Sequence, residues 1–256
     1  MIVFEYPLNE RIRTWLRVED LFEKSSYFMR GPDARAHHAA LLAIFELVDV
    51  MARPELRSEV IQELERQKTA LDAYRGNPGV DQQRLAAVIS QLANTLAELH
   101  AVSGKLGQHI RDNDWLATIK SRSSIPGGTC GFDLPGYHFW LNASPAERMA
   151  DLNAWIAPLL PVKAGVGVIL KLLRESGGMS RQLAGSGLYQ LMLGGRVAHL
   201  LRVAIDDDSQ CVPEVSANKY AVNLRFVSVE KHQKPRTLEQ DILFELGFCS
   251  LSGCCS

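Results

Sequence analysis

The strongest constraint on the fold is a change in hydrophobic periodicity along this chain of 256 residues. From residue 9 to about residue 122, apolar side chains recur at intervals of three and four, as they do on one face of an amphipathic helix. Similar stripes predict helices over 9–27, 33–51 and 54–71, and short connections favour antiparallel neighbours. The clearest stripe follows Asp81, a suitable N-cap, and comprises Leu85, Val88, Ile89, Leu92, Leu96 and Leu99.

The middle of the chain interrupts this periodicity. The run Ser124-Ile125-Pro126-Gly127-Gly128 cannot continue a helix, and it predicts a short strand at 129–132. Residues 137–141 fit either a helix or a strand. The sequence from Ser144 to Glu147 has the features of a capping box, so a helix is expected to begin there and to break near Pro158 and Pro161. A further helix is expected over 164–175.

After Gly185 the pattern changes to short runs typical of β-strands, at 188–193, 197–205, 220–229 and 241–248. Within 220–229, apolar residues alternate with Ala221, Asn223 and Arg225, which predicts one buried and one exposed face. The predicted fold class is therefore α+β, with a mainly helical domain over 9–180 followed by an antiparallel β-sheet domain over 181–248. Strands at 2–7 and 129–132 are expected to join this sheet, and residues 249–256 are expected to form a flexible tail.

Charge and composition narrow the range of functions. The 28 basic and 29 acidic residues nearly balance, which argues against a dedicated nucleic-acid-binding protein. The apolar run at 2–4 is too short for a signal peptide, and the run at 164–170 is far shorter than the roughly 20 residues of a membrane-spanning helix. The five cysteines are an odd number and do not suggest a disulfide framework. We therefore expect a cytoplasmic protein without a membrane or nucleic-acid partner.

One segment has the residue types of a catalytic site. Cys130 would be the nucleophile, His138 its base and Asp133 the orienting group of a cysteine-dependent hydrolase or transferase. The alternative, which we favour, is a tight turn entering a buried strand, with Cys130 as a small core residue. His232 and the cysteines near the C-terminus lack the spacing of a zinc site, so neither a metal nor another cofactor is expected.

Basic residues on the predicted sheet provide a second candidate site. Between Arg181 and Arg236 basic residues outnumber acidic ones, and three of the acids fall in one probable turn, Asp206 to Asp208. A solvated strand face is one interpretation, and an exposed basic face that holds an acidic peptide is the other. Alternation places Tyr220 opposite Arg225, which disfavours a stacking platform for nucleic acid.

Several motifs occur together in the order found in one protein family. They are Phe4-Glu5-Tyr6-Pro7-Leu8-Asn9-Glu10, Arg13-Thr14-Trp15-Leu16-Arg17, Pro78-Gly79-Val80-Asp81-Gln82, Ser124-Ile125-Pro126-Gly127-Gly128, Phe132-Asp133-Leu134-Pro135 and Phe244-Glu245-Leu246. Over nearly its whole length the chain resembles the ZapD family of bacterial cell-division proteins. The resemblance implies a cytoplasmic homodimer at the mid-cell division ring, not an enzyme, with a helical domain and a β domain in each subunit. It further implies that the protein binds the tubulin-like protein FtsZ and cross-links its filaments.

The resemblance also implies which residues bind the acidic C-terminal peptide of FtsZ. Arg53 and Arg225 match basic positions of the family, and Lys219 matches a basic position nearby. Ala221 stands where another arginine is expected, so the basic patch is either weaker here or rebuilt from Arg202 or Lys231. The helical domain is expected to provide the dimer interface.

Overall fold

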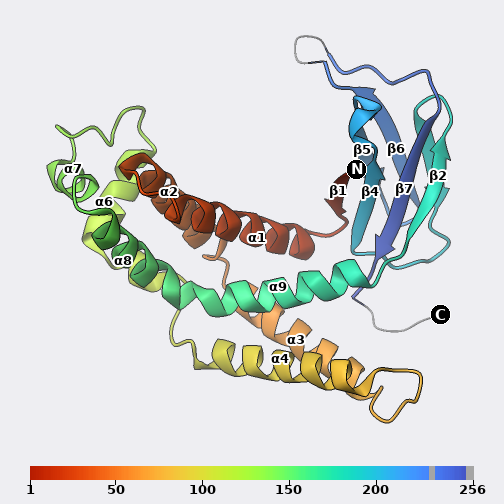
Figure 1. Ribbon diagram of the computed structural model, residues 1–256, viewed down its shortest axis with the longest axis horizontal. Coiled ribbons are helices and arrows are strands. Elements are labelled where there is room, and N and C mark those ends of the chain that lie inside the picture. The colour runs from red at the N-terminus through yellow and green to blue at the C-terminus, as the bar shows by residue number, and fades with distance from the viewer. Residues whose placement is uncertain (231–233, 252–256) are drawn as a thin grey trace. The chain divides into compact units, whose positions relative to one another are not determined.

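The computed structural model of the protein describes residues 1–230 and 234–251, and it divides into two compact units (Figure 1). Residues Thr14–Ile169 form one unit, which we call the helical unit. Residues Met1–Arg13 belong with the chain from Leu170 onward, and together they form what we call the sheet unit. Helices followed by antiparallel sheets confirm the predicted α+β class.

The helical part of the chain contains nine α-helices and one short 3₁₀ turn among the described residues. They are α1 (Glu10–Met29), α2 (Ala34–Val50), α3 (Leu56–Asp72), α4 (Gln82–Ala101), α5 (Gln108–Arg111), α6 (Asp114–Ser123), α7 (Pro135–Leu141), α8 (Pro145–Ile156), η1 (Ala157–Leu159) and α9 (Leu160–Glu175). The α3 and α4 helices lie side by side as a hairpin (Figure 1). The first turn of α1 and the last residues of α9 belong to the sheet unit.

The predicted helix starts at Asp81 and Ser144 are confirmed by their caps. The Asp81 carboxylate accepts hydrogen bonds from the backbone N–H groups of Gln83 and Arg84, which satisfies donors that lack intrahelical partners. Ser144 and Glu147 form the predicted capping box at the start of α8. The α4 stripe packs inward, since Leu85, Ile89, Leu92, Leu96 and Leu99 are buried.

A buried arginine joins the helices at one end of the helical unit. Arg148 on α8 is only 4% exposed, and its Nε donates to Nδ1 of His37 on α2 over 3.0 Å. The same guanidinium donates to backbone carbonyls of the α1–α2 connection and of the α7–α8 connection, namely those of Pro32, Leu141 and Ala143. The carbonyls are partly buried, and this one side chain supplies donors to acceptors from three separate segments.

The predicted strand at 129–132 is wrong, because this segment consists of turns. Local hydrogen bonds from the N–H groups of Gly128, Cys130 and Asp133 each reach a carbonyl three residues back, which closes the backbone on itself. A Cβ atom at Gly128 would lie 2.4 Å from the Arg122 carbonyl oxygen, so this turn requires glycine. The ambiguous residues 137–141 are helical, as part of α7.

The sheet unit contains two antiparallel sheets. Their strands are β1 (Ile2–Pro7), β2 (Met179–Ala184), β3 (Leu188–Met192), β4 (Leu200–Ile205), β5 (Cys211–Ala217), β6 (Ala221–Ser228) and β7 (Ile242–Cys249), with a 3₁₀ turn η2 (Asp207–Ser209) before β5. The first sheet has the order β1-β4-β7-β2 and the second β3-β6-β5. The expected strand at 2–7 is β1, whereas β2 and β5 were not predicted.

The inner faces of the two sheets share one hydrophobic core. Leu201, Val203 and Phe244 come from the first sheet, and Leu224 and Phe226 come from the second. The predicted alternation along β6 is confirmed, because Asn223 and Arg225 are exposed between these buried residues. Side chains with opposite parity therefore form the outer face of each sheet.

The chain remains ordered beyond the point where a flexible tail was expected. Cys249 is the buried last residue of β7, opposite Leu200 of β4, and Leu251 is also buried. The Leu251 N–H donates to Nδ1 of His199 over 3.0 Å, which extends the packing past the strand. The tail prediction is therefore wrong for these residues, and 252–256 lie outside the described part of the chain.

The α8 and α9 helices follow each other with a short interruption at η1, which contains Pro158 and confirms the expected break there. Pro161 instead lies in the first turn of α9, which begins at Leu160 rather than at the predicted residue 164. The stretch Pro145–Glu175 is long and apolar enough to cross a membrane by length and composition alone. Half of its most apolar window is buried within the protein.

Candidate functional site

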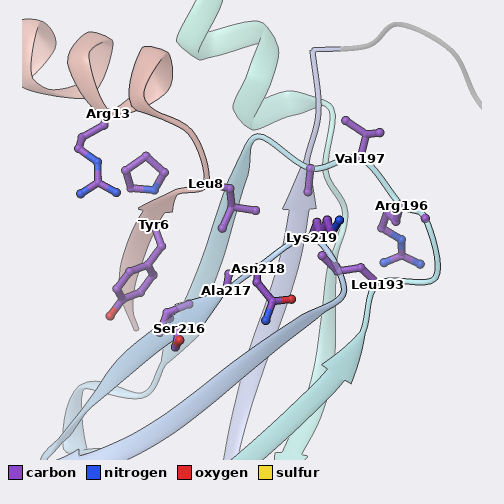
Figure 2. A pocket seen from close by; sticks show the side chains of 14 residues that line it. Tyr6, Leu8, Arg13, Leu193, Arg196, Val197, Ser216, Ala217, Asn218 and Lys219 are labelled. Atoms are coloured by element: carbon purple, nitrogen blue, oxygen red, sulfur yellow. The ribbon is translucent and has the colours of Figure 1, made fainter.

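The sheet unit contains a groove with a volume of about 840 Å³ (Figure 2). Three segments line it: the end of β1 with the start of α1, the β3–β4 connection, and the end of β5 with the turn that follows. The lining residues are Tyr6, Pro7, Leu8, Arg13, Leu193, Gly195, Arg196, Val197, Ala198, Val215, Ser216, Ala217, Asn218 and Lys219. β1 and β5 are edge strands of different sheets, and a hydrogen bond from the Tyr6 hydroxyl to the Pro213 carbonyl connects them.

The charged side chains that line the groove are all basic among the described residues. Arg13, Arg196 and Lys219 line it, and none of the lining residues that the structure describes is acidic. Arg196 lies over the Phe248 ring with 5.2 Å to its centroid, and Lys219 lies over the Tyr220 ring at 4.8 Å, so both cations are held by aromatic faces. Cations beside apolar side chains suit a ligand that carries both carboxylates and apolar groups.

Tyr6 fixes one wall of the groove. Its hydroxyl donates to the carbonyl of Pro213, which connects β1 of the first sheet with β5 of the second. Burial, with a smaller contribution from the Glu214 carboxylate, raises the pKa of Tyr6 above its usual value. The hydroxyl therefore remains a hydrogen-bond donor at neutral pH.

Among the predicted binding residues of the sheet unit, Lys219 lines the groove. Arg225 lies on the outer face of β6, where its Nε donates to Oε2 of Glu214 over 3.0 Å. Arg202 lies on the outer face of the first sheet, and its Nε is 3.3 Å from Oε1 of Glu5. Glu5 also accepts from Arg174, so Arg202 belongs to a local ion-pair network. The structure thus places Lys219, Arg225 and Arg202 on different surfaces.

Two further predicted residues are described separately. Arg53 belongs to the helical unit, in the turn before α3, and its guanidinium donates to Oγ1 of Thr14 over 2.8 Å. Lys231 lies outside the described residues.

Comparison with known proteins identifies the family. A family model described as "ZapD: Cell division protein" matches residues 16–225. A protein named "Cell division protein ZapD" from Azoarcus sp. (strain BH72) is 49% identical over 98% of this chain and 100% of its own length. Proteins of the same name from Aromatoleum aromaticum and Dechloromonas aromatica are each 47% identical, over 98% of this chain and 98% and 100% of their own lengths. The chain belongs to the ZapD family.

Membership of the ZapD family places the protein among cell-division proteins. The matched region contains Arg53, Arg196, Arg202, Lys219 and Arg225, so most of the basic positions discussed above fall within the family match. Arg13 lies just before it.

The alternative catalytic interpretation rested on Cys130, His138 and Asp133. Cys130 is exposed, which corrects the expectation of a core residue, because the predicted strand that would have buried it is absent. Within the described chain, no hydrogen bond joins the three side chains, and Nε2 of His138 instead lies 3.5 Å from the Asn142 amide nitrogen. The same described residues contain no cluster of three potential metal ligands.

Arg13 and Arg196 were missed as candidate binding residues. Arg13 lies in a helix and Arg196 in a loop. Neither their charges nor their positions in the sequence show that both residues line one groove. The detectable signal was the β3–β4 connection itself, since two glycines precede a basic residue between two predicted strands.

Proposed function

We propose that this protein binds the acidic C-terminal tail of FtsZ in the groove of its sheet unit and, as a homodimer, cross-links FtsZ filaments at the division ring. The observation that carries this proposal is the groove itself, which combines three cations with apolar walls and has no acidic residue among its described lining. Membership of a family of cell-division proteins supports the assignment to the division machinery. The function needs no catalytic step and no cofactor.

Geometry explains why such a protein would bundle filaments. A two-fold dimer presents the same groove twice, so it can hold tails from two filaments at once. A filament offers many tails, and multivalency converts weak single contacts into strong overall attachment. We assign dimerisation to the helical unit, where Phe132 and Phe139 expose 85% and 80% of their side chains. Aromatic residues are enriched at protein interfaces, which supports this assignment.

Within this proposal, Lys219 is the central contact, with Arg196 beside it. Arg13 contributes less than these two, because its Nε is 3.3 Å from Oε2 of Glu10. Arg225 and Arg53 contribute less, because each already makes a hydrogen bond within the protein. We keep Lys231 and Arg202 as secondary candidates: Lys231 follows β6 in the sequence, and Arg202 is already paired with Glu5. The protein acts in the cytoplasm at mid-cell in this proposal, without a nucleic-acid or membrane partner.

Co-sedimentation with GTP-assembled FtsZ tests the proposal. We expect the protein to pellet with full-length FtsZ, but not with tail-deleted FtsZ, and to pellet less as salt increases, because exposed charge pairs are screened. Lys219→Glu is expected to reduce pelleting strongly by placing an acid in the groove.

Lys171→Glu is the matched control, since Lys171 is an exposed lysine of the same unit and does not line the groove. This control should pellet like the unmodified protein. Equal losses in both variants would show that overall charge rather than the groove drives binding, and no pelleting of the unmodified protein would overturn the proposed function.

A further inference from the structure

One end of the groove is formed by two turns that are hydrogen-bonded to each other. The first lies in the β3–β4 connection and is closed by the Arg196 N–H, which donates to the Leu193 carbonyl over 2.9 Å. The second follows β5 and contains Asn218 and Lys219. The Leu193 N–H donates to the Tyr220 carbonyl over 2.7 Å, which holds the two turns together. Arg196, Asn218 and Lys219 therefore line the same end of the groove (Figure 2).

The first turn presents its backbone to the groove. Gly194 and Gly195 both have positive φ, 56° and 86°, so this turn requires glycine twice in succession. No atom beyond the adjoining residues lies within 4 Å of a Cβ at either position, so the space beside the turn is open. Within residues 1–230 and 234–251, the N–H groups of Gly195 and Val197 make no hydrogen bond. Successive N–H groups in such turns form concavities that bind anions.

Side chains add further donors at this end. The Arg196 guanidinium lies over the Phe248 ring, 5.2 Å from its centroid, which occupies the flat face and leaves the N–H edge available. Oδ1 of Asn218 accepts two backbone N–H groups of the following residues over 2.8 and 3.0 Å, so Nδ2 is the amide atom left to donate to a ligand. The Lys219 ammonium is a third donor, and the described lining contributes no carboxylate.

This set of donors fits a phosphate monoester better than a carboxylate. A carboxylate has two oxygens, whereas a phosphate monoester has three terminal oxygens and a charge of about −1.5 to −2 at pH 7. That charge matches the two cations Arg196 and Lys219. The arginine can bind two phosphate oxygens through its fork, and the backbone N–H groups and the lysine can reach the third.

The rest of the groove suits an uncharged, partly aromatic body. Tyr6, Leu8 and Val215 are half-buried there and contribute a ring and aliphatic side chains. The volume of about 840 Å³ falls within the roughly 300–1,000 Å³ typical of sites for small molecules. A ligand with a charged end and an apolar end therefore matches both parts of the groove.

We propose that the groove binds a small phosphate monoester with an aromatic body, such as a nucleoside monophosphate. The phosphate lies against the two turns, at Arg196 and Lys219, and the body lies toward Tyr6 and Leu8. This inference goes beyond the proposed function and does not depend on it. Where both hold, the ligand and an acidic tail at Lys219 exclude each other, so the ligand would inhibit attachment to filaments.

Isothermal titration calorimetry with AMP tests the inference. We expect adenosine, which lacks the phosphate, and inorganic phosphate, which lacks the body, each to bind at least about 10-fold more weakly than AMP. Arg196→Gln and Lys219→Gln should each weaken AMP binding about 10-fold, the lower end of the range for a hydrogen bond to a charged group. Lys171→Gln is the matched control, because Lys171 is an exposed lysine of the same unit outside the groove, and it should bind AMP like the unmodified protein.

A second measurement uses the unmodified protein and reports the backbone contacts. In amide NMR spectra, addition of AMP is expected to shift the N–H protons of Gly195 and Val197 downfield, as hydrogen bonds to a phosphate form. The Lys171 amide should not move.

The outcomes separate this inference from the proposed function. AMP binding that is absent, that is equal in Arg196→Gln, Lys219→Gln and Lys171→Gln, or that leaves the Gly195 and Val197 amides unmoved would overturn the site. Adenosine that binds as tightly as AMP would overturn phosphate recognition, and inorganic phosphate that binds as tightly would overturn the role of the body. These measurements contain no FtsZ, so their failure leaves the proposed function standing, and failure of co-sedimentation leaves the ligand site standing.

Discussion

Replacing Arg148 by methionine is expected to destabilise the helical unit more than any surface substitution. The guanidinium donates to four acceptors, which are Nδ1 of His37 and the carbonyls of Pro32, Leu141 and Ala143. Methionine fills a similar volume but donates to none of them. A buried acceptor left without a donor costs about 1–3 kcal/mol, which applies to Nδ1 of His37, whereas the three partly buried carbonyls cost less each.

The four costs do not add in full. Some acceptors regain a donor through small backbone shifts or an entering water. Folding of the variant also avoids the cost of removing a charged guanidinium from water, which its neutral partners only partly offset. We therefore expect Arg148→Met to lower the free energy of unfolding by about 2–4 kcal/mol, which is less than the sum of four separate losses. Arg148→Lys should lose nearly as much, because one ammonium group cannot reach acceptors arranged for a planar fork.

Urea unfolding followed by tryptophan fluorescence measures this change. All four tryptophans lie in the helical unit, and the Trp115, Trp140 and Trp155 rings have centroids 5.7–6.0 Å apart, so their emission reports this unit. Arg84→Met is the control, since Arg84 is an exposed arginine of the same unit and should change stability by no more than about 0.5 kcal/mol. A loss below about 1 kcal/mol in Arg148→Met would refute the argument that its buried acceptors need this donor.

Two further predictions concern binding and pH. Arg225→Gln and Arg53→Gln should each reduce co-sedimentation with FtsZ less than Lys219→Glu does, because both arginines are already hydrogen-bonded within the protein. A larger loss in either variant than in Lys219→Glu would show that the binding site is not the groove. Burial lowers the pKa of His38 below its usual value, so the unfolded state binds more protons and stability should fall as the pH drops below about 6.5. Urea unfolding between pH 7 and 5 checks this, and His38→Gln should show a weaker dependence on pH.

Local chemistry made the helical half of the chain predictable. Asp81 and Ser144 predict helix starts because each side chain caps the backbone N–H groups of the residues that follow it. The spacing of apolar residues then predicts the buried face of each helix. The alternation around Leu224 was also predictable from local sequence, since a strand that covers a core on one face buries every second residue.

The errors arose where distant contacts decide the local structure. The segment 129–132 has three glycines nearby and can form either a strand or successive turns, and the short-range hydrogen bonds of Gly128 and Cys130 favour the turns. β5 was not predicted because Pro213 suggests a break in a strand. β5 is an edge strand, however, and proline is tolerated there where its nitrogen faces away from the neighbouring strand. Cys249 and Leu251 are buried by residues far away in the sequence, which a terminal position does not reveal.

The candidate site shows why basic residues alone do not identify a binding surface. In the sequence, nothing distinguishes Arg202, Lys219 and Arg225 from one another. Only the strand register shows that Glu5 lies opposite Arg202 and that Glu214 lies opposite Arg225. The groove differs from the other basic surfaces because its described lining contains no acidic residue, and not because it contains more cations. Because acidic residues elsewhere keep the whole chain near neutrality, the local field of this groove depends on which side chains the two sheets bring together. A neutral chain can therefore carry a selective site for an acidic peptide, provided that its own carboxylates are paired on other surfaces.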